Sequence, residues 1–239
     1  MAPYESLISF TLDFTCPWTY LGKQRLEKAL SQYQQEHPPS PDSAVNFTLT
    51  FLPYQLQPAF PADEERDRRR WLSELHHGGS DEATAAFAEK MAALGAEDGI
   101  AFKSLSMGVV ANTLEAHRVL HCLQELQKSA QDGGAIEPAR FVDSVYESYF
   151  ESGCSPSSRE TLMVACKTAG VSGETAAGIV DGDEGLAEVK MLMREQKMNG
   201  VDSVPYVVFE GRKRDFTLVG ARSVEEYGKT LANIAKESL

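Results

Sequence analysis

The chain has 239 residues, of which 42% are apolar and 24% charged, and its formal net charge is -12 at pH 7. These are the proportions of a folded globular protein, and they exclude disorder as the dominant state. The acidic balance argues against general nucleic-acid binding, because an acidic surface repels phosphates and gains nothing from counterion release. We also expect no membrane segment and no secretory signal, since no apolar run approaches roughly 20 residues and residues 1–5 carry no basic side chain.

The first part of the chain predicts a strand, a helix and a second strand. Apolar and polar side chains alternate over residues 7–14, as in a half-buried strand. Pro17 suits the first position of a helix, and apolar residues then recur at helical spacing up to Pro38. Residues 45–51 alternate again and stop at Pro53. With a helical connection between them, the two strands should be parallel neighbours.

From about residue 63 to residue 198 the strand pattern disappears and helical periodicity replaces it. Ser157 and Glu160 have the spacing of a capping box, which predicts the start of one of these helices. The predicted helices cover residues 63–77, 81–94, 112–128, 138–152, 158–169 and 183–198.

The end of the chain returns to strands and closes with a helix. Residues 206–210 and 215–219 are short β-rich runs around a glycine turn, which predicts an antiparallel hairpin. Ser223 and Glu226 form a second capping-box pattern, opening a helix to about Lys236. The predicted order is therefore β-α-β, a helical block, then β-β-α.

The chain's four cysteines, Cys16, Cys122, Cys154 and Cys166, are widely spaced. They form neither a C-x-x-C motif nor a pair with zinc-ligand spacing, so reduced thiols in the cytoplasm are the simplest interpretation. Cys16 is placed at the N-terminus of the first predicted helix, where the helix dipole and free N–H groups favour a thiolate. The alternative is a buried, inert cysteine at a strand–helix junction.

Three segments resemble one protein superfamily. Residues 13–22 (Asp-Phe-Thr-Cys-Pro-Trp-Thr-Tyr-Leu-Gly) resemble the active-site segment of DsbA-like proteins of the FrnE type. They also resemble the matching segment of kappa-class glutathione transferases and 2-hydroxychromene-2-carboxylate isomerases, in which serine is typical at the position of Cys16. Residues 200–209 are similar to the superfamily's cis-proline loop and the strand after it, which implies a cis peptide bond before Pro205. Residues 112–118 are similar to its Asn-Ser-x-x-Ala-His-Arg helix.

The resemblance covers nearly the whole chain and implies an α/β protein: a thioredoxin fold (β-α-β … β-β-α) with a large inserted all-helical domain. Residues 1–60 and 199–239 would form the thioredoxin-like domain, and residues 61–198 the insert.

The motif departs from the dithiol members of the superfamily at Thr19, where FrnE-type proteins carry a second cysteine. A threonine cannot resolve a mixed disulfide by intramolecular attack, so dithiol oxidase chemistry is disfavoured. The Thr19 hydroxyl is instead expected to donate a hydrogen bond to the Cys16 thiolate or to a bound sulfur. We therefore predict Cys16 and Thr19 as the catalytic residues.

Single-thiol chemistry with glutathione is what the resemblance then implies. Glutathione would pair its cysteinyl backbone with Val204 and place its sulfur near Cys16 and Thr19. Pro17, Trp18 and Pro205 are candidate residues of the same binding site. Arg222 is a candidate partner for its carboxylates, with a solvated helix-end arginine as the alternative. Further candidate binding residues are Tyr54, Gln57, Asn112 and His117.

No metal site is expected. His117 and His121 stand four residues apart on one predicted helix, but the intervening acid and a third ligand are missing. The arginines at positions 68–70 are interpreted as a solvated face, with capture of an anionic substrate as the alternative.

Three functions are compatible with these features. The first is a cytoplasmic glutathione-dependent isomerase or transferase that acts on a small electrophilic metabolite through Cys16. The second is a monothiol oxidoreductase that adds or removes glutathione on protein cysteines. The third is a non-catalytic module that binds a peptide beside Pro205. The expected partners are glutathione and a small-molecule substrate, with neither nucleic acid nor membrane, and the superfamily implies a homodimer.

Overall fold

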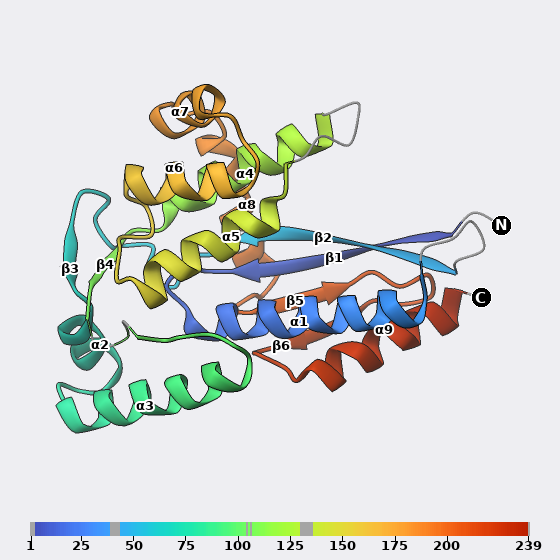
Figure 1. Ribbon diagram of the computed structural model, residues 1–239, viewed down its shortest axis with the longest axis horizontal. Helices are drawn as coiled ribbons and strands as arrows, with labels where there is room; N and C mark the ends of the chain where they lie inside the picture. The colour runs from blue at the N-terminus through green and yellow to red at the C-terminus, as the bar shows by residue number, and fades with distance from the viewer. Residues whose placement is uncertain (1–2, 39–43, 104, 106, 130–135, 239) are drawn as a thin grey trace. The chain divides into compact units, whose positions relative to one another are not determined.

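The computed structural model describes residues 3–38, 44–103, 105, 107–129 and 136–238 (Figure 1). The chain forms two compact units, one of Met1–Tyr54 with Gln196–Leu239 and the other of Gln55–Glu195. Among the described helices, none combines the length and the apolar character needed to cross a lipid bilayer.

The first unit is built on a four-stranded sheet with the strand order β2-β1-β5-β6. The parallel pairing of β1 with β2 confirms the prediction from the helical connection between them. β5 runs antiparallel to β1, and β6 completes the predicted hairpin with β5. The strand bounds are β1 Tyr4–Leu12, β2 Val45–Pro53, β5 Tyr206–Phe209 and β6 Phe216–Val219.

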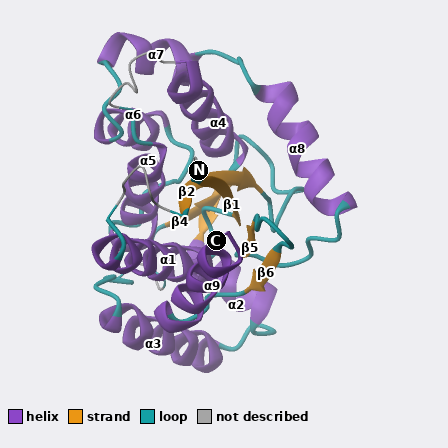
Figure 2. Ribbon diagram, turned by 90° about the vertical axis from the view of Figure 1, so that its right-hand side faces the viewer, coloured by secondary structure: helices purple, strands orange, loops and turns teal. Residues whose placement is uncertain are grey.

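The core of this unit lies between the sheet and two helices, α1 (Pro17–Glu36) and α9 (Val224–Ser238), which lie side by side in Figures 1 and 2. The period-two alternation of β1 places one set of side chains on the buried face of the sheet. The helices contribute apolar residues at spacings of three and four, which form a single stripe on each. Together these fully buried side chains are Ile8, Phe10, Leu12, Leu21, Leu26, Tyr227, Leu231 and Ile234.

Helix α9 is fixed at both ends. At its start, Ser223 donates from its backbone N–H and its hydroxyl to Glu226 Oε2, both at 3.0 Å, which confirms the predicted capping box. At its end, Arg212 Nη1 donates to the Ser238 carbonyl at 3.0 Å, and Arg214 pairs with Glu237 at 2.9 Å. Arg212 of the β5–β6 turn therefore binds a C-terminal carbonyl of this helix, while Arg214 binds a side chain of its last turn.

The second unit is mostly helical, as expected, but it also contains a small antiparallel sheet of β3 and β4. The prediction of an all-helical insert is therefore wrong in this respect. Both strands are only three residues long and β3 is fully exposed, so neither has the alternation that marks a strand in sequence. The elements are β3 Glu65–Asp67, α2 Arg68–His76, α3 Asp81–Glu97, β4 Val109–Ala111, α4 Leu114–Ser129, α5 Pro138–Tyr146, the π-helix η1 Glu147–Glu151, α6 Arg159–Thr168, α7 Gly173–Asp181 and α8 Leu186–Met198, which ends in the first unit.

Two details of the helical block differ from the prediction. Helix α6 is capped by Ser158, whose hydroxyl accepts from the Thr161 N–H, so the predicted Ser157 capping box is wrong. The Ser157 hydroxyl instead accepts from the Ala116 N–H of α4 at 3.3 Å. Helix α7 was not predicted, because glycines within it lower the local helix propensity.

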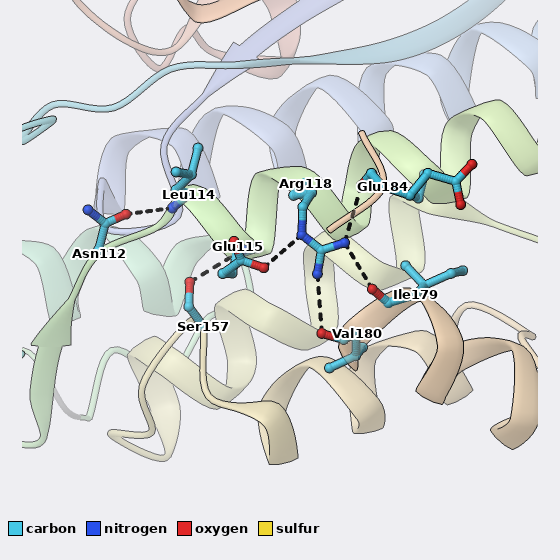
Figure 3. A network of polar contacts seen from close by, with 10 residues as sticks. Asn112, Leu114, Glu115, Arg118, Ser157, Ile179, Val180 and Glu184 are labelled. Carbon is cyan, nitrogen blue, oxygen red and sulfur yellow. Dashed lines mark hydrogen bonds and ion pairs between the residues drawn. The ribbon is translucent and has the colours of Figure 1, made fainter. Parts of the chain in front are cut away.

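Arg118 joins α4 to the end of α7 (Figure 3). Its side chain is fully buried, and its Nε bonds the Glu115 carboxylate at 2.7 Å. The other guanidinium nitrogens donate to the carbonyls of Ile179 at 2.9 Å, Val180 at 3.2 Å and Glu184 at 3.3 Å. A guanidinium matches several acceptors at once, so this residue satisfies the C-terminal carbonyls of α7.

The sequence suggested that the arginines at positions 68–70 form one solvated face, but the structure separates them. Arg68 is buried, with its guanidinium 3.5 Å from the centre of the Tyr149 ring and a hydrogen bond to the Tyr149 carbonyl at 2.8 Å. Exposed Arg69 and Arg70 are paired with carboxylates of their own unit. Arg68 therefore has a packing role, and its neighbours form the solvated surface.

Candidate active site

The turn between β1 and α1 presents Cys16 at the start of the helix. The Asp13 carbonyl accepts from the Cys16 N–H at 3.1 Å, while Asp13 Oδ1 accepts from the Thr15 N–H at 3.2 Å. Cys16 is the N-cap of α1 and Pro17 follows it in the first turn, as predicted. The sequence thus places the thiol at the positive end of a 20-residue helix.

Cys16 is nevertheless enclosed, with only 5% of its surface exposed. Its Sγ lies 3.6 Å from the Val204 carbonyl oxygen, within reach of a weak S–H hydrogen bond. Tyr54, Val201 and Val204 form a buried apolar cluster with it. Trp18 and Tyr206 pack against this cluster, so the thiol lies among aromatic and aliphatic side chains. These clustered residues all belong to the first unit.

This burial reverses the expected ionisation of Cys16. The pKa of the Cys16 thiol is raised to about 12, mainly by burial and in addition by the neighbouring Asp13 carboxylate. The N–H groups of Thr19 and Trp18 act in the opposite direction but do not compensate. The expectation of a thiolate at the helix N-terminus is therefore wrong for this structure, in which the thiol is neutral at pH 7.

Thr19, the residue in place of a resolving cysteine, is fully buried one turn into α1. Its hydroxyl lies 2.8 Å from the Asp13 carbonyl and 2.6 Å from the Cys16 carbonyl. It also lowers the pKa of Cys16 slightly. Because one O–H carries one proton, these carbonyls compete with sulfur for it, and the geometry gives Thr19 a clear part in shaping the turn.

Pro205 follows Val204 across a cis peptide bond and packs closely against α1. A Cβ placed on Gly22 would lie 2.9 Å from Pro205 Cγ and 3.6 Å from Ala221 Cα. The absence of a side chain at Gly22 therefore lets the loop carrying Val204 and Pro205 approach the helix that carries the thiol.

Arg222 lies at the start of α9 and is engaged with a carboxylate of its own helix. Its Nη1 is 3.5 Å from Glu226 Oε1, and the other oxygen of that carboxylate binds Ser223. An external carboxylate would have to compete with Glu226 for Arg222 and for the helix N-terminus. Its role toward glutathione stays a prediction.

The remaining predicted binding residues belong to the second unit and also stay predictions. Gln57 is half-buried, and His117 is buried in α4. Asn112 is occupied locally: its Oδ1 accepts from the Leu114 N–H and from the Gln55 side chain, both at 2.8 Å. Asn112 thereby fixes the start of α4 and the loop around Gln55.

The other thiols also lie in the second unit, and all four cysteines are free. Cys122 in α4 and Cys166 in α6 are buried, and burial raises the pKa of both. Cys154, between η1 and α6, is exposed. Within the part of the chain that the structure describes, no group of three or more His, Cys, Asp or Glu side chains could hold a metal ion.

Three residues of the site were not singled out in the sequence: Asp13, Val201 and Tyr206. Asp13 had a usable signal, since a carboxylate three residues before a helix N-cap is placed to form a turn beside it. The other two flank the cis-proline loop in sequence, but only the fold shows that they pack at the thiol.

Comparison with known proteins agrees with this architecture. A family model described as DSBA-like thioredoxin domain matches residues 7–232. A comparison with curated proteins finds no match.

Several solved structures share the fold. One is described as a probable DsbA oxidoreductase from Streptomyces coelicolor, with a TM-score of 0.76 and 22% identity over 97% of this chain and 91% of that one. A second is 2-hydroxychromene-2-carboxylate isomerase, with a TM-score of 0.61 and 13% identity over 96% of each chain. A third is the cytosolic disulfide reductase DsbM from Pseudomonas aeruginosa with GSH, with a TM-score of 0.54 and 16% identity over 96% of each chain. With the family model covering most of its length, the chain belongs to the DSBA-like thioredoxin domain family.

Proposed function

We propose that this protein is a glutathione-dependent isomerase or transferase that acts on a small electrophilic metabolite. The observation that carries the proposal is a single buried thiol at the start of α1, facing the Val204 carbonyl, with Thr19 where a second thiol would stand. Such a site lacks the means of intramolecular disulfide exchange. Two proteins of the same fold support it, an isomerase and a disulfide reductase whose structure contains glutathione.

The neutral state of Cys16 suggests its role. A thiol that keeps its proton is a poor nucleophile but a usable hydrogen-bond donor. We assign the attacking thiolate to glutathione and make Cys16 the group that donates its S–H to that sulfur. The N–H groups at the start of α1 would favour the same negative charge.

Two substitutions of Cys16 test this assignment. Cys16→Ser keeps a donor and should retain most of the turnover of glutathione with an electrophile, whereas Cys16→Ala should lower kcat about tenfold or more. Steady-state kinetics of both variants, with their folding checked by circular dichroism, gives the answer. Unchanged turnover in Cys16→Ala would remove Cys16 from the mechanism, and equal loss in both variants would indicate that the cysteine is itself the nucleophile.

A monothiol oxidoreductase is the second candidate, favoured by structural neighbours described as a probable DsbA oxidoreductase and a cytosolic disulfide reductase. In that reaction Cys16 attacks a glutathionylated protein and carries the glutathione as a mixed disulfide. Intact-mass measurement after incubation with a glutathionylated peptide separates the two functions, because only this one adds glutathione to Cys16.

We place the protein in the cytoplasm. Its free thiols suit a reducing compartment, and the neighbour DsbM is described as cytosolic. A homodimer stays a prediction from the superfamily, which size-exclusion chromatography with light scattering can test.

A further inference from the structure

Tyr54 combines a buried aromatic ring with a hydroxyl that no described residue binds. The residue follows the last residue of β2, and its N–H is fixed by the Leu12 carbonyl at 3.0 Å. The residue is only 8% exposed and packs in the same cluster as Cys16 and Val204. Its hydroxyl has no hydrogen bond to the described residues and is not fully enclosed. Tyr54 thus has a largely buried ring in the same cluster as the thiol and an O–H that no described residue binds.

The surroundings of Tyr54 keep this phenol protonated. Burial raises its pKa, and the carboxylates of Asp202 and Asp13 raise it further. The same two carboxylates disfavour a substrate whose anionic group would occupy this position. A neutral molecule with a hydrogen-bond acceptor is therefore the ligand that fits best.

We propose that the Tyr54 hydroxyl is the acid of the site, donating to the carbonyl oxygen of an uncharged α,β-unsaturated ketone or aldehyde. This inference rests on the proposed function and names its substrate class. A soft thiolate and a neutral O–H donor in one site match conjugate addition. In that reaction the nucleophile attacks one end of the conjugated system while negative charge develops on the oxygen at the other.

The step balances without an oxidant or reductant. The glutathione sulfur forms a bond to the β-carbon, the C=C electron pair shifts toward the carbonyl, and the carbonyl oxygen takes the Tyr54 proton. In transfer, the enol then returns its proton to Tyr54, and the α-carbon gains the proton that the glutathione thiol released. In isomerisation, the enol returns its proton, the C–S bond breaks after rotation, and the alkene re-forms with glutathione regenerated.

Tyr54→Phe provides the test, because it removes the hydroxyl and keeps the ring. Benzylideneacetone, an aryl enone, is compared with benzyl chloride, from which the thiolate displaces chloride without forming an oxyanion. We expect Tyr54→Phe to lower kcat for the enone about 30-fold or more and to change that for benzyl chloride less than threefold. Tyr33→Phe, near the other end of α1, is the matched control and should leave both rates unchanged.

The outcomes separate this inference from the proposed function. If the unmodified protein adds glutathione to both substrates and Tyr54→Phe keeps the full enone rate, the acid assignment is overturned. Equal loss on both substrates also overturns it, since that pattern indicates lost packing. If the unmodified protein accelerates neither reaction, the proposed function itself fails.

Discussion

At the level of single residues, the properties of Cys16 result from opposing contributions. The N-terminus of α1 and the N–H groups of Trp18 and Thr19 favour a thiolate, whereas burial and the Asp13 carboxylate favour the thiol. Burial is the largest contribution, so the protonated form dominates until strongly alkaline pH. Folding thus stabilises the thiol, and this contribution to stability is present below pH 9.0 and lost as the pH rises toward about 12.

The rate of alkylation by iodoacetamide measures the protonation state of Cys16 directly. At pH 7 a thiol with this pKa has roughly one thiolate in 10^5 molecules, so iodoacetamide should label exposed Cys154 and leave Cys16 unmodified. Labelling of Cys16 should become appreciable only well above pH 9. Peptide mass spectrometry across a pH series follows each cysteine separately, and neutral-pH labelling of Cys16 as fast as that of Cys154 would refute the neutral-thiol assignment.

At the level of elements, the site depends on how closely helix α1 packs against the cis-proline loop. Gly22 is the position of contact, since a Cβ there would lie 2.9 Å from Pro205 Cγ. The proline ring is held at both ends by the main chain and has little freedom to move aside. Two elements separated by more than 180 residues therefore meet through a position that tolerates no side chain.

Two Gly→Ala substitutions test this packing. Gly22→Ala should lower the free energy of unfolding by about 1–3 kcal/mol through overpacking, and should reduce turnover by shifting Val204 and Pro205. Gly228→Ala, in α9 of the same unit, has open space around its Cβ and should raise stability by about 0.5–1 kcal/mol. Urea unfolding of both variants gives the comparison, and a stabilised Gly22→Ala would contradict the close approach.

At the level of the whole molecule, charge is the property that acts over distance. The chain carries a formal net charge of -12, while glutathione has two carboxylates against one ammonium group. Approach of this anion is therefore opposed by the overall field, which salt screens with a Debye length of about 10 Å at 0.1 M. Arg222 offers one local positive charge, but Glu226 already faces it.

If the protein uses glutathione, its KM for glutathione should therefore depend on the salt concentration. Raising NaCl from about 20 to 200 mM should lower KM for glutathione about two- to threefold, because screening weakens the repulsion. The uncharged thiol 2-mercaptoethanol serves as the control and should show no such dependence. A KM for glutathione that rises with salt would instead mean that a local cationic site dominates its binding.

Short-range pattern in the sequence determined much of this protein. Alternation predicted β1, β2 and the closing hairpin, and Pro17 fixed the start of α1, with Cys16 as its N-cap. The Ser223–Glu226 pair specified the start of α9. Each of these features depends on residues within a few positions of one another, so each can be predicted from the sequence without knowledge of the fold.

The tertiary structure alone determined the protonation state of Cys16, the burial of two arginines and the small second sheet. The direction of the Cys16 pKa shift comes from enclosure by side chains as distant in sequence as Tyr54 and Val204. Arg68 and Arg118 are buried against backbone carbonyls that lie far away in the sequence. The pairing of β3 with β4 also joins distant segments, so local sequence patterns predict none of these contacts. Desolvation and hydrogen bonding depend on which groups meet in space. The sequence therefore determined where the Cys16 thiol lies, and the tertiary structure determined its protonation state.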